Sequence, residues 1–366
     1  MSLTQKLHDL GQSLWLDNIT RGILDNGTLA RYIDEYSVTG LTSNPTIFDE
    51  AIAGSSFYDD GIRKKAKAGA KGEGLFVELA LEDLRRAADL FRPVFDRTAG
   101  VDGWVSMEVS PLLADDTRST IEAARSIHKL ADRPNLYVKI PGTPAGVPAI
   151  EEAIFAGVPV NVTLLFSREQ YLAVAEAYMR GLERRIAAKL DVRTSSSVAS
   201  LFVSRWDKAV ADKVPAELRN RLGIAIAART YKAHCDLLKT ERWRALAAAG
   251  ARVQRMLWAS TGTKDPKASP TLYVEALVAP NTVDTMPEKT LAALAALAAN
   301  KANTAAATLT ADGGDAEQVI ARFAKAGVDV DALAKKLQLE GAESFVKSWK
   351  ELMQSIADKS ATLATT

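Results

Sequence analysis

Short apolar runs recur along the chain, and each is followed by a longer segment in which apolar residues repeat with helical periodicity. Such alternation is typical of parallel strands that are connected by helices. We expect strands at residues 14–19, 40–44, 104–109, 136–140, 160–165, 198–203, 255–260 and 282–285. The pattern therefore predicts eight strand–helix units.

The segments between these runs carry helix signals. Apolar side chains in residues 75–96 recur mostly at three- and four-residue steps. Ser167 with Gln170 three residues later is a capping-box pattern, which marks a helix start. Gly250 can end a helix, and Pro287 can occupy the first turn of one. We expect helices at residues 75–96, 167–190, 216–239, 241–249 and 288–300.

Eight strand–helix units favour a closed barrel over an open sheet. An open doubly wound sheet normally carries a Gly-rich phosphate loop after its first strand, and residues 16–22 contain no such cluster. The 366 residues also fit the length range of one barrel. We therefore predict the α/β class, with a single (β/α)8 TIM barrel and additional C-terminal helices.

The chain beyond about residue 311 continues with helical periodicity, in residues 316–326, 329–338 and 343–356. No linker rich in Gly, Ser or Pro precedes these segments. We therefore expect one barrel domain over residues 1–366, with about residues 312–366 packed on the barrel as a helical extension.

Polar side chains stand out at five positions of the predicted strands. Strand interiors of a parallel barrel are buried on both faces and are expected to be apolar. Five of the exceptions are Asp17 in the first strand, Glu108 in the third, Lys139 in the fourth, and Asn161 and Thr163 in the fifth. These residues are therefore candidates for a functional site.

Lys139 is the most informative of these residues. Because side chains alternate along a strand, Lys139 shares a face with Tyr137, and Thr163 shares a face with Asn161. If that face is the barrel interior, the lysine, two carboxylates and a hydroxyl converge where barrel enzymes build their active sites. Burial disfavours the charged form of a lysine, so more neutral amine is left to attack a carbonyl. The alternative is a buried ion pair that ties strands together, although such pairs are often no better than hydrophobic replacements.

Composition and charge narrow the function classes. Hydrophobic residues make up 47% of the chain and charged residues 25%, as in ordinary globular proteins. Lys plus Arg (46) nearly balances Asp plus Glu (45), and no basic stripe is present, which argues against a nucleic-acid partner. An anionic substrate is still compatible with this balance, because one or two positioned cations can hold a phosphate.

The single cysteine and the three histidines are not expected to take part in catalysis or metal binding. The single cysteine, Cys235, excludes an internal disulfide and a Cys-based metal site, and we expect a buried structural thiol. His8, His128 and His234 fall in helical stretches, so we expect no metal or general-base role for them.

The first residues lack the basic and then apolar pattern of a signal peptide, and no apolar run approaches the ~18 residues of a membrane span. We expect a cytoplasmic protein without a membrane partner.

The strand motifs resemble those of transaldolases of the longer bacterial subclass. The blocks that carry the resemblance are WLDN from residue 15, LTSNPTIF from 41, VSMEVSP from 105, LYVKIP from 136, VNVTLLFS from 160, SLFVSR from 200 and WASTGTK from 258. TSNP alone is a weak signal, but VKI followed about twenty residues later by NVTLLFS is specific. The resemblance extends from about residue 14 to about residue 291.

The resemblance implies catalytic roles for four residues. Lys139 would form a Schiff base with C2 of a ketose phosphate. Asp17 would act as the general acid/base that removes the proton from the C4 hydroxyl. Glu108 and Thr163 would position the water that carries protons during imine formation and hydrolysis.

The resemblance also implies binding roles. Asn44 and Ser200 would contact the dihydroxyacetone unit, and Arg205 and Ser260 would bind the phosphate. Arginine suits this task because its planar fork matches phosphate oxygens. The alternatives are that Arg205 only caps the next helix and that Asn44, which precedes a proline, has a purely structural role.

The sequence departs from the family pattern at Gly262. Shorter transaldolases carry a second phosphate arginine two residues after the serine that corresponds to Ser260, and here that residue is Gly262. Lys264 follows shortly and would supply the missing charge as a point cation; a solvated loop lysine is the alternative. The hydroxyls of Thr261 and Thr263 are further donor candidates in the same loop.

The resemblance implies a transaldolase of the pentose phosphate pathway. Such an enzyme transfers dihydroxyacetone from sedoheptulose 7-phosphate to glyceraldehyde 3-phosphate, so its partners would be ketose and aldose phosphates. It needs no cofactor, and a monomer or homodimer is expected. A fructose-6-phosphate aldolase is the nearest alternative, but its relatives are much shorter and tend to carry Gln at the position of Glu108. A barrel that binds sugar phosphates without catalysis, as a sensor or scaffold, is the other alternative. The role of the C-terminal helices is open, and one hypothesis is that they cover the phosphate end of the site.

Overall fold

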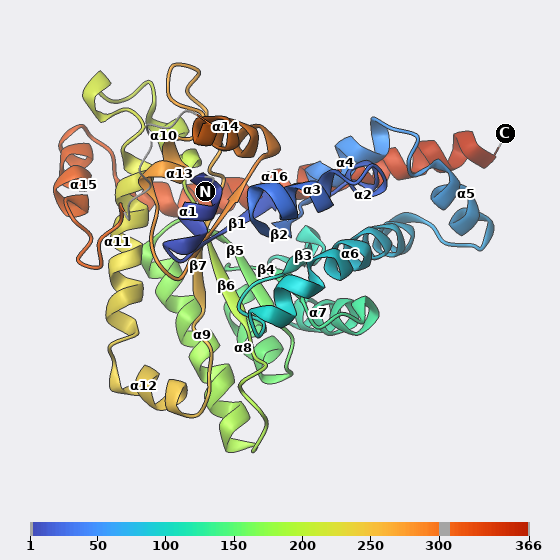
Figure 1. The fold of residues 1–366 in the computed structure, drawn as a ribbon, viewed down its shortest axis with the longest axis horizontal. Helices are drawn as coiled ribbons and strands as arrows, with labels where there is room; N and C mark the ends of the chain where they lie inside the picture. The colour runs from blue at the N-terminus through green and yellow to red at the C-terminus, as the bar shows by residue number, and fades with distance from the viewer. Residues whose placement is uncertain (1–2, 300–307, 365–366) are drawn as a thin grey trace.

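The strands form a ring in which all neighbours run parallel. The computed structural model describes residues 3–299 and 308–364. In chain order the strands of this part are β1 Gln12–Asp17, β2 Val38–Thr42, β3 Val105–Glu108, β4 Leu136–Pro141, β5 Val160–Leu165, β6 Ser197–Phe202, β7 Arg255–Ala259 and β8 Thr282–Met286. Their order in the sheet is β2-β1-β8-β7-β6-β5-β4-β3. Figure 1 shows the helices arranged around these strands.

The two ends of this order, β2 and β3, meet and nearly close the barrel. A parallel bridge pairs Gly40 with Trp104, and the N–H of Leu41 donates to Trp104 O over 2.9 Å. A Cβ at position 40 would lie only 2.7 Å from Trp104 O and from the ring of Trp15, so this seam requires glycine. The predicted (β/α)8 TIM barrel is confirmed.

The helices connect the strands and continue beyond the last one. Up to β5 they are α1 Leu3–Asp9, α2 Arg21–Asp25, α3 Thr28–Tyr36, α4 Pro45–Ala53, α5 Asp59–Lys67, α6 Gly72–Arg97, α7 Thr117–Ala131 and α8 Gly146–Phe155. After β5 they are α9 Arg168–Ala187, α10 Ser204–Val210, α11 Leu222–Leu237, α12 Glu241–Ala248, α13 Leu272–Ala276, α14 Glu288–Ala299, α15 Ala316–Lys325 and α16 Val330–Ala364. The capping box of Ser167 and Gln170 at the start of α9 is confirmed. The predicted end of the helix at residue 300 lies outside the described residues.

The helix predicted over residues 216–239 is wrong in its first turns. Asn220 adopts a φ of +59°, which does not continue a right-handed helix, and α11 begins only at Leu222. The carboxylate of Asp207 accepts hydrogen bonds from the N–H groups of Leu222 (2.9 Å) and Gly223 (3.2 Å). A side chain that is distant in sequence therefore sets the start of α11, which periodicity alone does not reveal.

The two helices predicted between residues 329 and 356 form one helix, α16, so that boundary was wrong. Gly341, at the expected break, costs a helix only about 1 kcal/mol relative to alanine. A Cβ there would lie 2.9 Å from Leu164 Cδ2, so glycine lets α16 approach β5 closely. Gln338 Nε2 donates to the carbonyls of Gly142 and Leu164, at 3.0 Å each. The helix therefore packs across the ends of β4 and β5.

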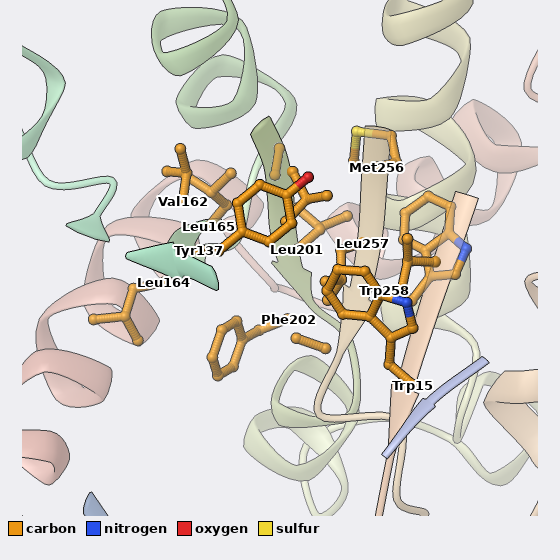
Figure 2. Packing of buried hydrophobic residues seen from close by; sticks show 14 of the residues in the cluster. Trp15, Tyr137, Val162, Leu164, Leu165, Leu201, Phe202, Met256, Leu257 and Trp258 are labelled. Carbon is orange, nitrogen blue, oxygen red and sulfur yellow. The ribbon is translucent and has the colours of Figure 1, made fainter. Parts of the chain in front are cut away.

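Aromatic rings fill part of the barrel interior. Trp104 and Tyr137 stack with ring centroids 4.0 Å apart, and Trp15 lies 6.1 Å from Tyr137. Figure 2 shows Tyr137 and Trp15 in this core together with Leu257 and Phe202 from β7 and β6. Because Tyr137 points inward, the side chain two residues later on β4 points inward as well. The face shared by these two residues is therefore the barrel interior.

The cysteine and the histidines occupy helices. Cys235, predicted as a buried thiol, is only half-buried on α11, because the buried face of this helix carries its neighbour His234 instead.

Across the described residues no helix has the length and apolarity needed to cross a membrane. In the same part of the chain, no three His, Cys, Asp or Glu side chains are grouped to hold a metal ion.

Candidate active site

Lys139 lies inside the barrel near the C-terminal end of β4, with 6% of its surface exposed. Its Nζ donates to Ser43 O over 2.9 Å and lies 3.4 Å from Glu108 Oε2. Glu108 is paired with Lys139 in the register of β3 and β4, so the two side chains leave adjacent strands side by side. The ion pair considered from the sequence is therefore present.

A cavity of about 130 Å³ opens over Lys139 at the C-terminal ends of the strands. Its wall consists of Asp17, Thr42, Asn44, Lys139, Thr163, Ser200, Phe202, Arg205, Leu257, Ala259, Ser260, Gly262, Lys264, Thr285, Pro287 and Phe345. Every residue to which the resemblance assigns a catalytic or binding role lines this cavity except Glu108, which contacts Lys139. The candidates Asn161, Thr261 and Thr263 do not line it. An ion pair that only tied strands together would not explain this gathering of polar groups around an open space.

Asp17 ends β1 and faces the cavity. Thr42 Oγ1 donates to Asp17 Oδ1 over 2.7 Å, across the paired ends of β1 and β2. Burial raises the pKa of Asp17, while the charge of Lys139 and the Thr42 hydrogen bond oppose that rise. A carboxyl with a raised pKa suits proton transfer in both directions at neutral pH.

Glu108 and Thr163 lie on the strands on either side of β4. Burial raises the pKa of Glu108, and the adjacent charge of Lys139 opposes the rise. Thr163 Oγ1 is buried and has no hydrogen-bond partner within the part of the chain that the structure describes. A buried hydroxyl in this state costs on the order of 1–3 kcal/mol. Such a position is consistent with a group that serves a ligand or a water.

Ser200 and Asn44 are both anchored by hydrogen bonds at the cavity wall. Ser200 Oγ donates to Asn161 Oδ1 over 2.7 Å, and Asn161 Nδ2 donates to Ser106 Oγ over 3.2 Å. Asn44 is the N-cap of α4, where its Oδ1 accepts from the N–H of Ile47 over 3.1 Å. The structural role considered for Asn44 is therefore present, and its amide NH2 is still a donor beside the cavity.

Cations gather at one end of the cavity. Arg205 lies in the first turn of α10, with its guanidinium carbon 5.2 Å from the centroid of the Phe202 ring. Desolvation lowers the pKa of Arg205, although a guanidinium stays charged at neutral pH. Desolvation, followed by repulsion from Arg205 and Lys208, lowers the pKa of Lys264. Such neighbouring cations suit an anionic group at this end.

Ser260 closes the same end of the cavity from the loop after β7. Its φ of +56° is uncommon for a residue other than glycine. Its Oγ lies 3.0 Å from the hydroxyl of Ser204. Unusual backbone conformations of this kind persist only where the surrounding structure holds them, which is frequent at ligand sites.

The hydroxyls of Thr261 and Thr263 are engaged within the protein. Thr261 Oγ1 lies 2.9 Å from each of two acceptors, Asp284 Oδ1 and Thr285 O, and Thr263 Oγ1 donates to Ser269 O over 2.7 Å. Each hydroxyl has one hydrogen to donate, so the prediction that they offer donors to a phosphate was wrong. Thr261 instead anchors the loop to Asp284, whose pKa burial raises to about 7.

Comparisons with known proteins agree with the motifs. The profile of the transaldolase/fructose-6-phosphate aldolase family matches residues 14–356. The chain belongs to this family. It is 44% identical to the transaldolase of Thiobacillus denitrificans over 97% of this chain and 100% of the relative. It is also 44% identical to the transaldolases of Saccharopolyspora erythraea, over 97% of each chain, and of Thermobifida fusca, over 98% of each.

Several residues of the cavity wall were not predicted from the sequence as site residues. Thr42 and Phe202 lie in the motifs that carry the resemblance, close in sequence to Asn44 and Ser200. This closeness to predicted site residues could have indicated them. Thr285 is a polar residue in a predicted strand, but it was not among the predicted site residues. Phe345 comes from α16, far beyond the last motif, and no pattern in the sequence points to it.

Proposed function

We propose that this protein is a transaldolase of the pentose phosphate pathway. It transfers a dihydroxyacetone unit from sedoheptulose 7-phosphate to glyceraldehyde 3-phosphate, yielding erythrose 4-phosphate and fructose 6-phosphate. The family and the relatives named transaldolase support this class. The observation that carries the proposal is that Lys139, almost fully buried, faces a cavity that Asp17 also lines.

The first step is attack of Lys139 Nζ on C2 of the ketose phosphate. The carbinolamine that forms loses water and becomes a protonated imine. Glu108, 3.4 Å from Nζ and with a raised pKa, accepts and returns protons in this step. Thr163 Oγ1, which has no partner among the described residues, binds the water that leaves C2 and later returns.

The second step breaks the C3–C4 bond. Asp17 takes the proton of the C4 hydroxyl, and the bond's electron pair moves into the iminium to give an enamine, while the aldose phosphate leaves. When the acceptor aldehyde binds, C3 of the enamine attacks its carbonyl carbon, and Asp17 returns the proton to the new hydroxyl. Water then releases the new ketose from Lys139. The iminium is the electron sink, so the reaction requires no metal or organic cofactor.

Binding groups at the two ends of the cavity orient the substrate. Asn44 and Ser200 hold the hydroxyls of the dihydroxyacetone unit, and Arg205 and Ser260 hold the phosphate. We assign Lys264 as the second phosphate cation. In support, a Cβ at Gly262 would lie 3.9 Å from Lys264 Nζ, so the ammonium lies beside the position where shorter relatives carry arginine.

A fructose-6-phosphate aldolase would carry out the same cleavage but release dihydroxyacetone to water. The presence of glutamate rather than glutamine at position 108 favours the transferase. So does length, since relatives named transaldolase align over 97–100% of their own chains.

Donor cleavage with and without an acceptor tests the proposal. With fructose 6-phosphate and erythrose 4-phosphate, we expect sustained formation of sedoheptulose 7-phosphate and glyceraldehyde 3-phosphate. With fructose 6-phosphate alone, we expect glyceraldehyde 3-phosphate to stop at about one equivalent per active site, because the enamine waits for an acceptor. Sustained release of dihydroxyacetone would identify an aldolase, and no cleavage under either condition would contradict both activities.

A further inference from the structure

Phe345 places an aromatic ring on the cavity wall from outside the barrel strands. The side chain belongs to α16 and is 8% exposed. Its ring centroid lies 5.9 Å from Lys139 Nζ. The ring therefore forms the part of the cavity wall that lies next to Lys139 Nζ.

One face of α16 positions this ring. Gln338, Gly341 and Phe345 are three and four residues apart, so they lie on the same side of the helix. Gln338 bonds the carbonyls at the ends of β4 and β5, and a Cβ at Gly341 would lie 3.4 Å from an Nη of Arg205. The same helix face thus reaches both the lysine end and the arginine end of the cavity.

The helix is also held beyond Phe345. Thr46 Oγ1 donates to Ser348 Oγ over 2.8 Å, two residues after Asn44. The rings of Trp349 and Phe76 pack edge to face with centroids 5.2 Å apart. Contacts on both sides of Phe345 therefore fix the ring over the cavity.

We propose that Phe345 keeps water away from the enamine on Lys139, so that the bound three-carbon unit is transferred rather than released. This inference rests on the proposed Schiff-base chemistry and adds a residue that the strand motifs do not contain. An apolar ring has no proton to give. Its face also attracts the positive charge of the iminium that precedes and follows the enamine.

Release and transfer differ in one step. In release, C3 of the enamine takes a proton from water, which restores the iminium. Water then adds to C2 and the C2–N bond breaks, giving dihydroxyacetone and the free amine of Lys139. In transfer, C3 forms a bond to the carbonyl carbon of the acceptor in place of the bond to hydrogen. Exclusion of water from C3 therefore favours transfer, while Glu108 and Thr163 still supply the water for hydrolysis at C2.

The ratio of dihydroxyacetone released to dihydroxyacetone transferred tests this role, with fructose 6-phosphate as donor and erythrose 4-phosphate as acceptor. For full-length Phe345→Ala we expect the ratio to rise by about tenfold or more, because water enters the emptied space. Phe345→Leu keeps an apolar side chain and should show a smaller rise. Leu337→Ala is the matched control, since Leu337 is 4% exposed on the same helix and does not line the cavity. Its ratio should equal that of the wild type.

Reduction with borohydride in the presence of fructose 6-phosphate, applied to each protein, separates this inference from the proposed function. If the wild type forms no adduct on Lys139, the Schiff-base proposal fails and this inference falls with it. If the wild type and Phe345→Ala both form the adduct but release the same share of dihydroxyacetone, only the inference is overturned. An equal rise in Leu337→Ala would also overturn it, because helix packing would then explain the effect. If Phe345→Ala does not fold, Phe345→Leu decides, with a rise of the ratio supporting the inference and no rise overturning it.

Discussion

Thr42 donates a hydrogen bond to Asp17 over 2.7 Å, and its own oxygen lies 2.7 Å from the hydroxyl of Thr285. A hydroxyl has one hydrogen, and that of Thr42 is committed to Asp17, so Thr285 is the donor of the second bond. Two hydroxyls in series therefore end on the carboxyl that we propose as the general acid/base. The bond stabilises the carboxylate form of Asp17 against the effect of burial on its pKa.

Thr42→Val removes this bond and keeps the shape of the side chain. We expect the pKa of Asp17 to rise further, because the carboxylate loses a donor while burial remains. Cleavage requires the carboxylate, so activity is lost as pH falls through this pKa, and the acid limb of kcat/KM should move to higher pH. Thr285→Val, which removes only the outer hydroxyl, should move the limb less. An unchanged limb in Thr42→Val would show that Asp17 does not set it.

Asp17→Asn should separate Schiff-base formation from carbon–carbon cleavage. The amide retains the shape and can still accept from Thr42, but it cannot take the C4 hydroxyl proton. We expect transfer to fall by about 10²–10⁴-fold, the usual contribution of a general base. Borohydride trapping on Lys139 should persist in the same variant. Transfer at close to the wild-type rate would exclude Asp17 as the base.

Thr163→Val should lower activity without lowering stability. The substitution is close in volume and removes a buried hydroxyl that lacks a partner among the described residues. We expect the free energy of unfolding to stay the same or to rise by about 1 kcal/mol, because no hydrogen bond within the protein is lost. Imine formation, measured as the rate of borohydride trapping, should slow. A stability loss above about 2 kcal/mol would indicate a structural hydroxyl instead.

Asp284 should make stability depend on pH. Burial raises its pKa from 3.8 to about 7, which corresponds to about 4 kcal/mol. Because the folded-state value is the higher one, this contribution is fully present below pH 4 and is lost as pH rises through about 7. Asp284→Asn, which resembles the protonated form, should therefore gain stability relative to the wild type between pH 4 and pH 8. Denaturant unfolding of both proteins checks this, and a difference that does not change with pH would contradict it.

The barrel was predictable because buried parallel strands are nearly continuous apolar runs. The run at residues 160–165 coincides with β5, whereas the first run was placed two residues late relative to β1 Gln12–Asp17. Strand ends depend on pairing with neighbours, which a single strand does not encode. The break expected near Gly341 shows the same limit, since contact with β5 decides that this residue stays helical.

The site was predictable where a polar residue interrupts an apolar strand, as at Lys139 and Asp17. Such a signal does not exist for Phe345, which is an ordinary apolar residue of an amphipathic helix until the fold brings it to the cavity. The sequence also does not reveal that Thr42 donates a hydrogen bond to Asp17, because that contact depends on the register of β1 and β2. The single domain, the cytoplasmic location and the monomeric or homodimeric state stay predictions.

The central claim is that Lys139 is the nucleophile. Its most direct test is reduction with borohydride in the presence of fructose 6-phosphate, followed by peptide mass analysis of the wild type and of Lys139→Ala. We expect one stable adduct on the wild type, on Lys139 alone, and neither adduct nor transfer in the variant. An unmodified Lys139, an adduct on another lysine, or full activity in Lys139→Ala would contradict the account.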